Sequence, residues 1–410
     1  KVGKGTLEIT TAYDSSDKKY GYLRVGDGKV VFNTEKQAFN GVYLTSGRGT
    51  LELTKDKAQA FGAEKDNKPI DAKFKHHFKL EQGDRDSLGI YFGNGGGNLD
   101  LKGNSLTLNT ISSNDSRANI INTDTDTSNP SYITIEGYGY NNEKDNKNKK
   151  NEKADTIIHA SFGQSTNGTN TANTNNNLNL IYKGENGGSS STGGSQAALI
   201  FDGNIDAKGL EVTNGKVVLQ GHPTTHAYIR DQQITVGARK ENFLNIVKKA
   251  ENAENLPEWM DFSRPSHLEQ PDWDHRVFKI KEINLKDSNF DIGREATLQG
   301  NITANGNSTI NFGGNIKHYI DKKDGENTTG NGFEYQQEVE KQKLKEQDKA
   351  NQTIHFKGSI TATGTTIKSS IYDLNAKLDL KSGAKLNADF LTLDRETHAS
   401  GAILTMDTNS

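Results

Sequence analysis

The stretch LQGNITANGNSTINF, residues Leu298–Phe312, decides the fold of this chain, because versions of it return along most of the sequence. It alternates apolar and polar residues, turns on Asn and Gly, and alternates again, as short strands joined by a tight turn do. Other instances are GKGTLEI (3–9), VGDGKVVF (25–32), SGRGTLEL (46–53), NGGGNLDL (94–101), KGNSLTL (102–108), FDGNIDAKGLEV (201–212), NGKVVL (214–219), FKGSITATGTTI (356–367) and LDLKSGAKLNADFLTL (378–393). So short a strand buries too little surface alone, so the units must stack. The repetition predicts an all-β solenoid of parallel strands, with about 20 to 25 residues per coil.

Composition agrees with a stacked column rather than a compact globule. Only 31% of the 410 residues are hydrophobic, which is low for a globule but suits a thin core with one inward residue for each outward one. The 42 glycines can supply turns with positive φ. Proline, which removes a ladder donor, occurs only 6 times, as continuous stacking requires.

Charge and cysteine content bear on partners and compartment. The formal net charge of −3 gives no electrostatic reason to expect nucleic-acid binding. The chain has 0 cysteines, which fits a protein exported through an oxidising compartment. There is no run of apolar residues long enough for a membrane-spanning helix, so no membrane insertion is expected. The chain starts at Lys1 in the middle of a repeat phrase and without a signal peptide, which suggests a piece of a longer protein.

Three segments follow from the pattern. Solenoid coils are expected over residues 1–238, with polar loops near 141–153 and 164–196, and again over 279–410, with an exposed helical loop near 334–352. Residues 239–278 break the alternation and form an expected decoration on the outside of the column.

The decoration has its own character. Phe243, Leu244, Val247 and Ala250 have helical spacing, which predicts a short helix. Both tryptophans of the chain follow, and they are expected to pack against the flank of the solenoid or against each other. They are Trp259 and Trp273.

The inward residues of the repeats are the predicted core. They are Leu51, Leu53, Leu99, Leu101, Leu106, Val217 and Ile302. Aromatic residues at strand positions are interpreted as part of the same interior, with an exposed aromatic stripe for sugar binding as the alternative. They are Tyr20, Tyr22, Phe32, Phe39, Tyr43, Tyr91 and Phe92.

No catalytic, cofactor-binding or metal-binding residue is predicted. Serine catalysis needs a framed nucleophile with a base, and the nearest string, GDRDS (83–87), lacks the framing glycine. His76 and His77 would point to opposite faces of a strand. His222 and His226 sit on a predicted turn, and no further metal ligand stands near them in the sequence.

Two other polar features keep alternatives open. The carboxylates of NTDTDTSN (122–129) form either a polar turn or a weak calcium site, although the spacing matches no EF-hand loop. His267 and His275 flank the prolines of the decoration, where a contact with a partner is an alternative to a purely structural role.

Several phrases together resemble one protein family. GKGTLEI, VGDGKVVF, SGRGTLEL and GGGNLDLKGNSLTL, followed in order by NLNLIYK, NGKVVLQGHPTTHAY and PDWDHRVFKIKEINLKDSNF, are similar to the passenger of the immunoglobulin A1 protease and Hap-type serine protease autotransporters, peptidase family S6. The match is specific from residue 1 to about residue 290, whereas 293–410 is generic repeat.

The resemblance implies a right-handed parallel β-helix that works as a stalk in a secreted bacterial protein. In that family the stalk follows a serine protease domain and precedes a C-terminal outer-membrane barrel, which are the implied partners. It supports secretion and display of the protease at the cell surface. The family's catalytic positions have no counterpart in these residues, so this chain is not expected to be an enzyme, although its parent would be a serine endopeptidase.

Two other functions stay open. One is an adhesin stalk that binds host proteins or associates with itself through its polar faces. The other is a β-helical polysaccharide lyase or hydrolase, which would need acidic residues recurring at one lateral position of successive coils. Such a column is not evident in the sequence.

Overall fold

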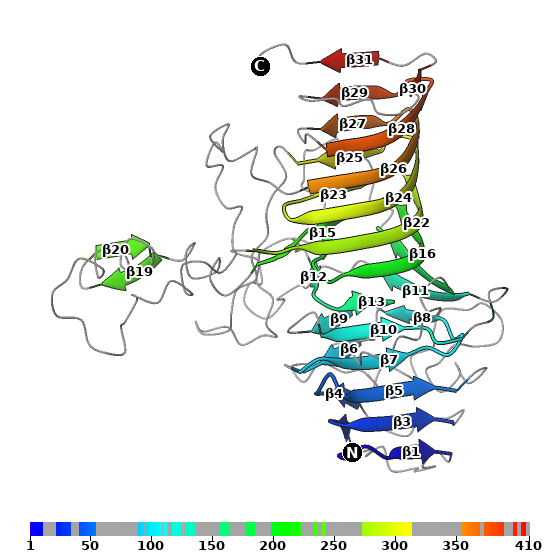
Figure 1. Ribbon diagram of the computed structural model, residues 1–410, viewed down its shortest axis with the longest axis vertical. Coiled ribbons are helices and arrows are strands. Elements are labelled where there is room, and N and C mark those ends of the chain that lie inside the picture. The colour runs from blue at the N-terminus through cyan, green and yellow to red at the C-terminus, as the bar shows by residue number, and fades with distance from the viewer. Residues whose placement is uncertain are drawn as a thin grey trace, which may run out of the picture.

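The computed structural model describes the repeats and leaves the longest insertions aside. The described residues are 1–10, 22–33, 41–54, 89–93, 95–108, 110–113, 117–124, 126, 128, 130–136, 156–163, 177–184, 198–223, 233–236, 239–242, 273–313, 354–369, 373–388, 397–399 and 403–406. These residues form stacked parallel strands in a single tall column, with the N-terminus at one end and the C-terminus at the other (Figure 1).

The first face of the column is the longest path of hydrogen-bonded strands in the described chain. Its strands in spatial order are β1 (Thr6–Ile9), β3 (Gly28–Phe32), β5 (Gly49–Leu53), β7 (Gly97–Asp100), β10 (Ala118–Ile121), β13 (Ser161–Phe162), β16 (Ile205–Thr213), β22 (Arg276–Lys286), β24 (Ala296–Asn305), β26 (Ile354–Thr363), β28 (Asp373–Lys381) and β30 (Thr397–Ala399). The longer strands from β16 onward bend and continue onto a second face, which starts with β8 (Leu106–Leu108), β11 (Ser131–Glu136) and β14 (Leu178–Lys183).

The third face consists of two sheets, one after the other. They are β2 (Tyr22–Val25), β4 (Gly41–Leu44), β6 (Gly89–Phe92) and β9 (Thr110–Ser113), then β12 (Thr156–Ile158), β15 (Ala198–Phe201), β17 (Lys216–Leu219), β23 (Asn289–Ile292), β25 (Thr309–Phe312), β27 (Thr366–Ser369), β29 (Lys385–Ala388) and β31 (Ile403–Met406). One coil therefore runs through the third, first and second faces in turn.

Register is kept from coil to coil by one inward residue stacking on its equivalent. On the first face this column is Val30, Leu51, Leu99, Ile120, Phe162, Ile205, Phe278, Leu298 and Phe356. Arg276 pairs with Ala296, and Phe290 pairs with Ile310, so the coil here has 20 residues, within the predicted range.

The predicted core is confirmed. All seven predicted inward residues are buried, and so are the aromatics Phe32, Tyr43 and Phe92. Strands such as β5 and β16 alternate buried and partly exposed residues as the repeat phrase does. Removing a Leu or Ile side chain from water contributes about 1.5–3 kcal/mol, so stability is spread along the whole column. The other four aromatics lie outside the residues whose side chains the structure describes.

The corners between the second and third faces explain the Asn, Asp or Gly that ends each phrase. Asn214, Asp287, Gly306, Gly364 and Gly383 occupy this corner in five coils, with φ of 52°, 50°, 68°, 67° and 76°. Glycine and, less readily, Asn and Asp adopt this left-handed conformation. The turn residues of the sequence thus set where each strand stops.

Between β17 and β22 the chain leaves the column and returns to it close to the point where it left. β18 (His222–Pro223) pairs antiparallel with β21 (Trp273–Asp274), and between them β19 (Gln233–Val236) pairs antiparallel with β20 (Arg239–Asn242). The expected boundaries at 238/239 and 278/279 therefore fall in the β19–β20 hairpin and inside β22, because the parallel pairing of β22 with β24 begins at Arg276. The predicted helices at 243–250 and 334–352 and the loops at 141–153 and 164–196 lie outside the described residues.

The anchor of this excursion is the buried Trp273. Its side chain is 5% exposed, and the Arg294 guanidinium lies 5.8 Å from the ring centroid. The expectation that Trp273 packs against the solenoid flank is thereby confirmed, whereas Trp259 lies outside the described residues.

Inward and outward neighbours on β24 provide a matched test of the column. Replacing Ile302, which is 1% exposed, with Ala is expected to lower the free energy of unfolding by about 2–5 kcal/mol, since neighbouring coils fix the cavity walls. Thr303→Ala on the outward side should change it by less than about 0.5 kcal/mol. Chemical denaturation followed by circular dichroism measures both, and equal effects would contradict the assigned register.

Candidate functional site

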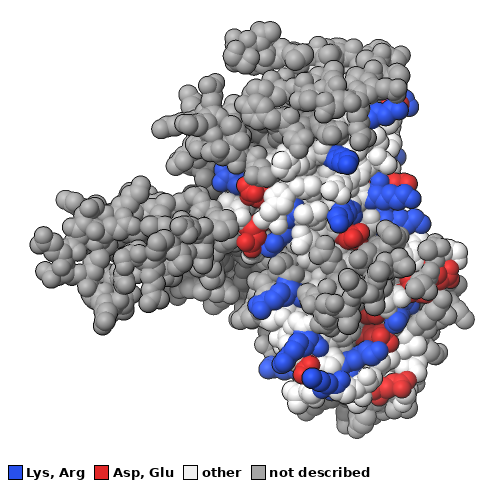
Figure 2. Space-filling model, viewed as in Figure 1, with Lys and Arg blue, Asp and Glu red and all other residues white. Residues whose placement is uncertain are grey.

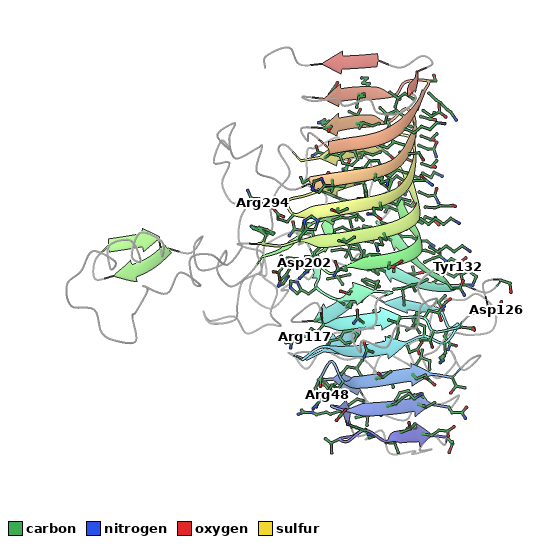
Figure 3. The ribbon with its side chains drawn as sticks, in the orientation of Figure 1. Arg48, Arg117, Asp126, Tyr132, Asp202 and Arg294 are labelled. Atoms are coloured by element: carbon green, nitrogen blue, oxygen red, sulfur yellow. The ribbon has the colours of Figure 1, made fainter. Side chains whose placement is uncertain are left out.

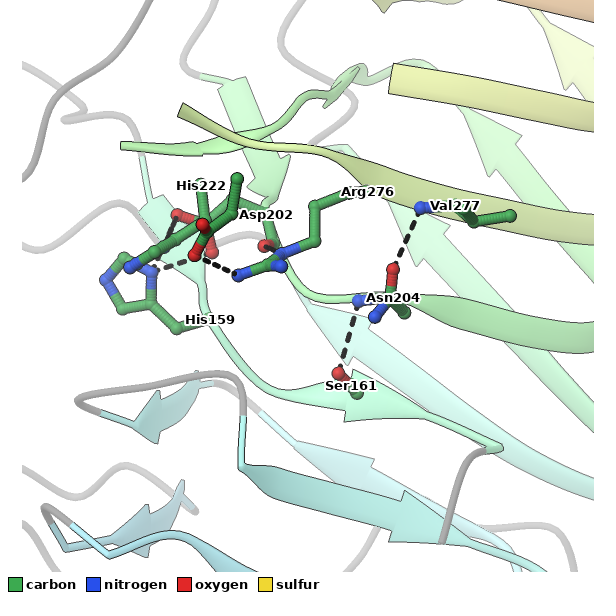
Figure 4. A network of polar contacts seen from close by, with 8 residues as sticks. His159, Ser161, Asp202, Asn204, His222, Arg276 and Val277 are labelled. Carbon is green, nitrogen blue, oxygen red and sulfur yellow. Dashed lines mark hydrogen bonds and ion pairs between the residues drawn. The ribbon is translucent and has the colours of Figure 1, made fainter. Parts of the chain in front are cut away.

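The most concentrated chemistry in the described chain lies where third-face strands end. His159 follows β12, Asp202 follows β15, and His222 lies in β18, three residues after β17. Because β12, β15 and β17 are neighbours in the sheet, these residues come from three successive coils. We call His159, Asp202 and His222 the corner cluster (Figure 4).

The corner cluster has short contacts centred on one carboxylate. His159 Nδ1 lies 2.7 Å from Asp202 Oδ1 and 2.8 Å from Oδ2, and His222 Nδ1 lies 2.9 Å from Oδ2. A carboxylate only accepts, so both rings donate from Nδ1. The imidazoles are perpendicular, with centroids 5.2 Å apart. Two rings are thus oriented by one acid.

Burial makes this arrangement electrostatically significant. His159 and Asp202 are 1% and 0% exposed, whereas the His222 side chain is 23% exposed and forms the open side of the cluster. Burial alone would raise the pKa of the Asp202 carboxyl, but the charges and hydrogen bonds of His159 and His222 outweigh it and hold that pKa well below its usual range. Asp202 is therefore an anionic centre inside the protein.

Arg276 joins this centre to the next coil. Its Nε donates to the Asp202 backbone oxygen at 2.7 Å, and a terminal nitrogen lies 3.5 Å from an Asp274 carboxylate oxygen. Beside it, Asn204 receives the Val277 N–H at 2.8 Å, and its own N–H donates to Ser161 Oγ at 3.1 Å. These bonds tie the start of β22 to the two coils below it (Figure 4).

The corner cluster could not be read from neighbours in the sequence. His222 was considered there with His226, which lies outside the described residues, and without a further ligand nearby. Its spatial partners stand 20 and 63 residues earlier in the chain. The only available signal is positional: His159 and Asp202 each come directly after a third-face strand. Recognising it requires the coil register.

Of the segment 122–129, the structure describes residues 122–124, 126 and 128. Asp126 and the exposed Tyr132 lie on the opposite edge of the column from Asp202 (Figure 3). Asn122 Oδ1 accepts the Asp124 N–H at 3.1 Å, and Asp124 Oδ1 accepts the Asp126 N–H at 3.2 Å. Asp126 Oδ1 accepts the Ser128 N–H in the same way. These oxygens act as local turn acceptors, which supports the polar-turn interpretation over a calcium loop.

Among the other sequence candidates, His275 lies in the described part of the chain. His275 contacts Glu295 Oε2 at 3.3 Å and Thr297 Oγ1 at 2.8 Å on the surface of the column. The GDRDS string, His76, His77 and His267 lie outside the described residues. On the face seen in Figure 2, basic and acidic side chains are interspersed over the described surface.

Residues 176–370 match a family model described as the PIC/HAP1/IgA0 second beta-solenoid repeat region. They include Asp202, His222 and Arg276 of the site described above, whereas His159 precedes the match.

Relatives extend the likeness beyond the family match. Serine protease EspC of Escherichia coli O127:H6 is 28% identical over 420 residues, which cover 95% of this chain and 27% of that protein. The adhesion and penetration protein autotransporter of Haemophilus influenzae is 30% identical over 327 residues, which cover 76% of this chain and 18% of that protein. The chain thus spans about a quarter of the first of these relatives and less of the second.

Solved structures show the same fold. The passenger domain of the plasmid-encoded toxin of enteroaggregative E. coli matches 95% of this chain and 36% of that one, with a TM-score of 0.51 and 24% identity. The H. influenzae Hap adhesin matches 99% and 39%, with a TM-score of 0.55 and 21% identity. The predicted β-solenoid and the resemblance to autotransporter passengers are confirmed, and with them the assignment to a secreted or surface-displayed class. No helix in the described ranges is long and apolar enough to span a membrane.

The buried Asp100 in β7 yields a pH prediction for the stability of the column. Burial raises the pKa of its carboxyl, with the Thr123 hydrogen bonds and the Lys102 charge opposing the rise only in part. The folded state then binds the proton more tightly than the unfolded state, so this group's contribution to stability falls as pH rises from about 4 through the raised pKa. Asp100→Asn removes the dependence.

The Asp100→Asn variant is therefore expected to be more stable relative to the parent chain at neutral pH than at about pH 3.5. Denaturation midpoints at the two pH values measure this, with Asp379→Asn as the control at a carboxylate whose side chain is 41% exposed. An Asp100→Asn variant that is less stable relative to the parent chain at neutral pH than at about pH 3.5 would contradict the sign.

Proposed function

We propose that this chain is the stalk which holds a serine protease domain away from the bacterial surface and helps to deliver it there. The observation that supports this most directly is the unbroken register of inward residues along the first face, from Val30 to Phe356. A continuous column holds its two ends at a fixed distance from each other. At about 4.8 Å per strand, the twelve strands of that path extend over roughly 50 Å.

The same register provides a physical route for secretion. Each coil offers a finished strand edge and an apolar layer on which the next coil can dock, so folding propagates along the axis. Folding outside the outer membrane would then bias transport outward without an external energy source. The protease domain and the C-terminal barrel of the parent protein are the partners in this proposal.

An adhesin stalk is the second candidate. It is favoured by the likeness to the H. influenzae adhesion and penetration protein and to the solved Hap adhesin. The outward positions of β24 and β26 are mainly Asn, Thr, Gln and Ser, which provide hydrogen-bonding groups in regular rows. The two functions are compatible in one passenger.

The segment between β18 and β21 is proposed to be a decoration that the stalk carries. Its two ends meet in the antiparallel pair of His222 with Asp274 and of Pro223 with Trp273. An excursion closed in this way can vary without disturbing the coils on either side. The proposed decoration therefore runs from about residue 224 to about residue 272, instead of the expected 239–278.

Secretion can be tested in the parent autotransporter with two substitutions on β26. Ile360→Asp places a charge in the column, where Ile360 is 0% exposed, and is expected to reduce passenger at the cell surface severalfold. Lys357→Asp on the exposed side of the same strand should leave delivery near the parent level. Surface passenger is measured by antibody binding to intact cells. Equal delivery by Ile360→Asp and Lys357→Asp would refute the proposed role of coil folding.

The proposed stalk is not itself catalytic. In the described ranges, His159 and His222 are oriented by Asp202, while the Ser161 hydroxyl accepts a hydrogen bond from Asn204. Purified chain is therefore expected not to hydrolyse casein above the buffer level. Cleavage that stays with the chain through repeated purification would show that peptidase chemistry resides in these residues.

A further inference from the structure

The corner cluster has the donor set of a transition-metal site. His159, Asp202 and His222 each offer a ligand atom, and these atoms lie within 4.8 Å of one another. Two imidazole nitrogens and one carboxylate oxygen form a set that suits Zn²⁺ and leaves a fourth position open. We propose that this cluster binds a divalent transition metal of the zinc type and cross-links three successive coils of the solenoid.

The geometry requires only a small adjustment. The two Nδ1 atoms lie 2.8 and 2.9 Å from Asp202 Oδ2, whereas ligands of a tetrahedral zinc ion lie about 3.3 Å apart for bonds near 2.0 Å. An opening of about half an ångström is needed. His222 can supply it because it is the partly exposed member, and its side of the cluster also provides the route for the ion.

The proton balance also permits metal binding. In the hydrogen-bonded state each ring carries its proton on Nδ1 and donates to the carboxylate. When the metal binds at Nδ1, a neutral ring carries that proton on Nε2 instead, and a protonated ring, which already has a proton on Nε2, releases its Nδ1 proton to solvent. The metal takes the place of two donated protons at the same carboxylate, and no oxidant or reductant is involved.

The surrounding charges favour a cation here. Asp202 is an anion at 0% exposure, and a divalent ion would compensate it directly. Arg276 is the nearby positive charge, but it binds the Asp202 backbone oxygen, and its guanidinium lies 3.5 Å from the Asp274 carboxylate. The carboxylate of Asp202 is thus left to the two imidazoles and the metal.

The ligands are also held in place before any ion arrives. The Asp202 N–H donates to the Ile158 oxygen at 3.3 Å, and the Gln220 N–H donates to the Phe201 oxygen at 3.0 Å, so the parallel ladder fixes the three coil ends relative to one another. A metal at this corner would brace the base of the excursion between β18 and β21. Its role is structural, as in sites that contribute their binding energy to folding.

The experiment uses the 410-residue chain, stripped with EDTA and dialysed. Titration with ZnCl₂ is expected to show one tightly bound ion per chain by calorimetry and elemental analysis, and a midpoint of thermal unfolding raised by several degrees. Co²⁺ in its place should give the visible absorption of a tetrahedral complex. His222→Ala should weaken Zn²⁺ binding by about 100-fold or more and abolish the thermal shift.

A matched control separates this site from surface imidazoles. His275→Ala removes another His–carboxylate contact, in which His275 is 34% exposed and is bonded to Glu295. It should retain binding and the thermal shift in full. Far-UV circular dichroism of each variant without metal establishes that the solenoid is intact, and His222→Gln provides a second variant if His222→Ala does not fold.

Three results would overturn the proposal. One is that the folded parent chain takes up no Zn²⁺ or Co²⁺, which would leave the cluster a hydrogen-bonded network only. Another is that binding survives in folded His222→Ala and His222→Gln. The third is that His275→Ala abolishes binding, which would assign the ion to the surface pair.

Discussion

The stacking of equivalent inward residues in a parallel register is the constraint on which this structure depends. Val30 lies on Leu51, Leu51 on Leu99, and Leu99 on Ile120, although the distance in sequence between partners varies from 21 to 48 residues. A slip by one residue would turn every inward side chain outward. The strand pairing is thereby fixed, while the connections between strands are free to vary in length.

That freedom explains how the chain tolerates its insertions. Between Ile302 and Ile360, which pair directly, 57 residues intervene, whereas between Ile360 and Leu378 there are 17. Both steps advance the column by one coil. The described chain leaves the column after β25 and rejoins it at β26 in register, so the length of the connection does not disturb the axis of the column.

The corners therefore concentrate the chemistry of this protein. The faces are regular because each outward residue lies in a row with its equivalents in neighbouring coils. A residue at a corner stands at the end of a strand, where ladder pairing stops on one side, so its side chain is less constrained in direction. Asp202, His159 and His222 use this release to turn toward one another across three coils. Arg276 and Asn204 then secure the point where the chain rejoins the column. The column and the corner cluster are two consequences of the same stacking.

Much of the fold followed from the sequence because its causes are local. Alternation in phrases such as GTLEL determines which side chains face inward, and Asn, Asp or Gly at the end of a phrase permits the left-handed corner, as at Asn214 and Gly306. Leu51, Leu99 and Ile302 were predicted inside on this basis and are buried.

What only the tertiary structure decided is which distant residues meet. The sequence established that His222 is followed by proline in a turn-like phrase, but it gave no reason to join it with Asp202 or His159. The lengths of the insertions do not reveal how many residues complete a coil, so register across them is not local information. Once the inward column fixes that register, the ends of β12, β15 and β17 come together, and a buried acid lies between two imidazoles. The sequence by itself determined the repeating strand and its turn, whereas the site depends on the vertical alignment of coils, which only long-range packing sets.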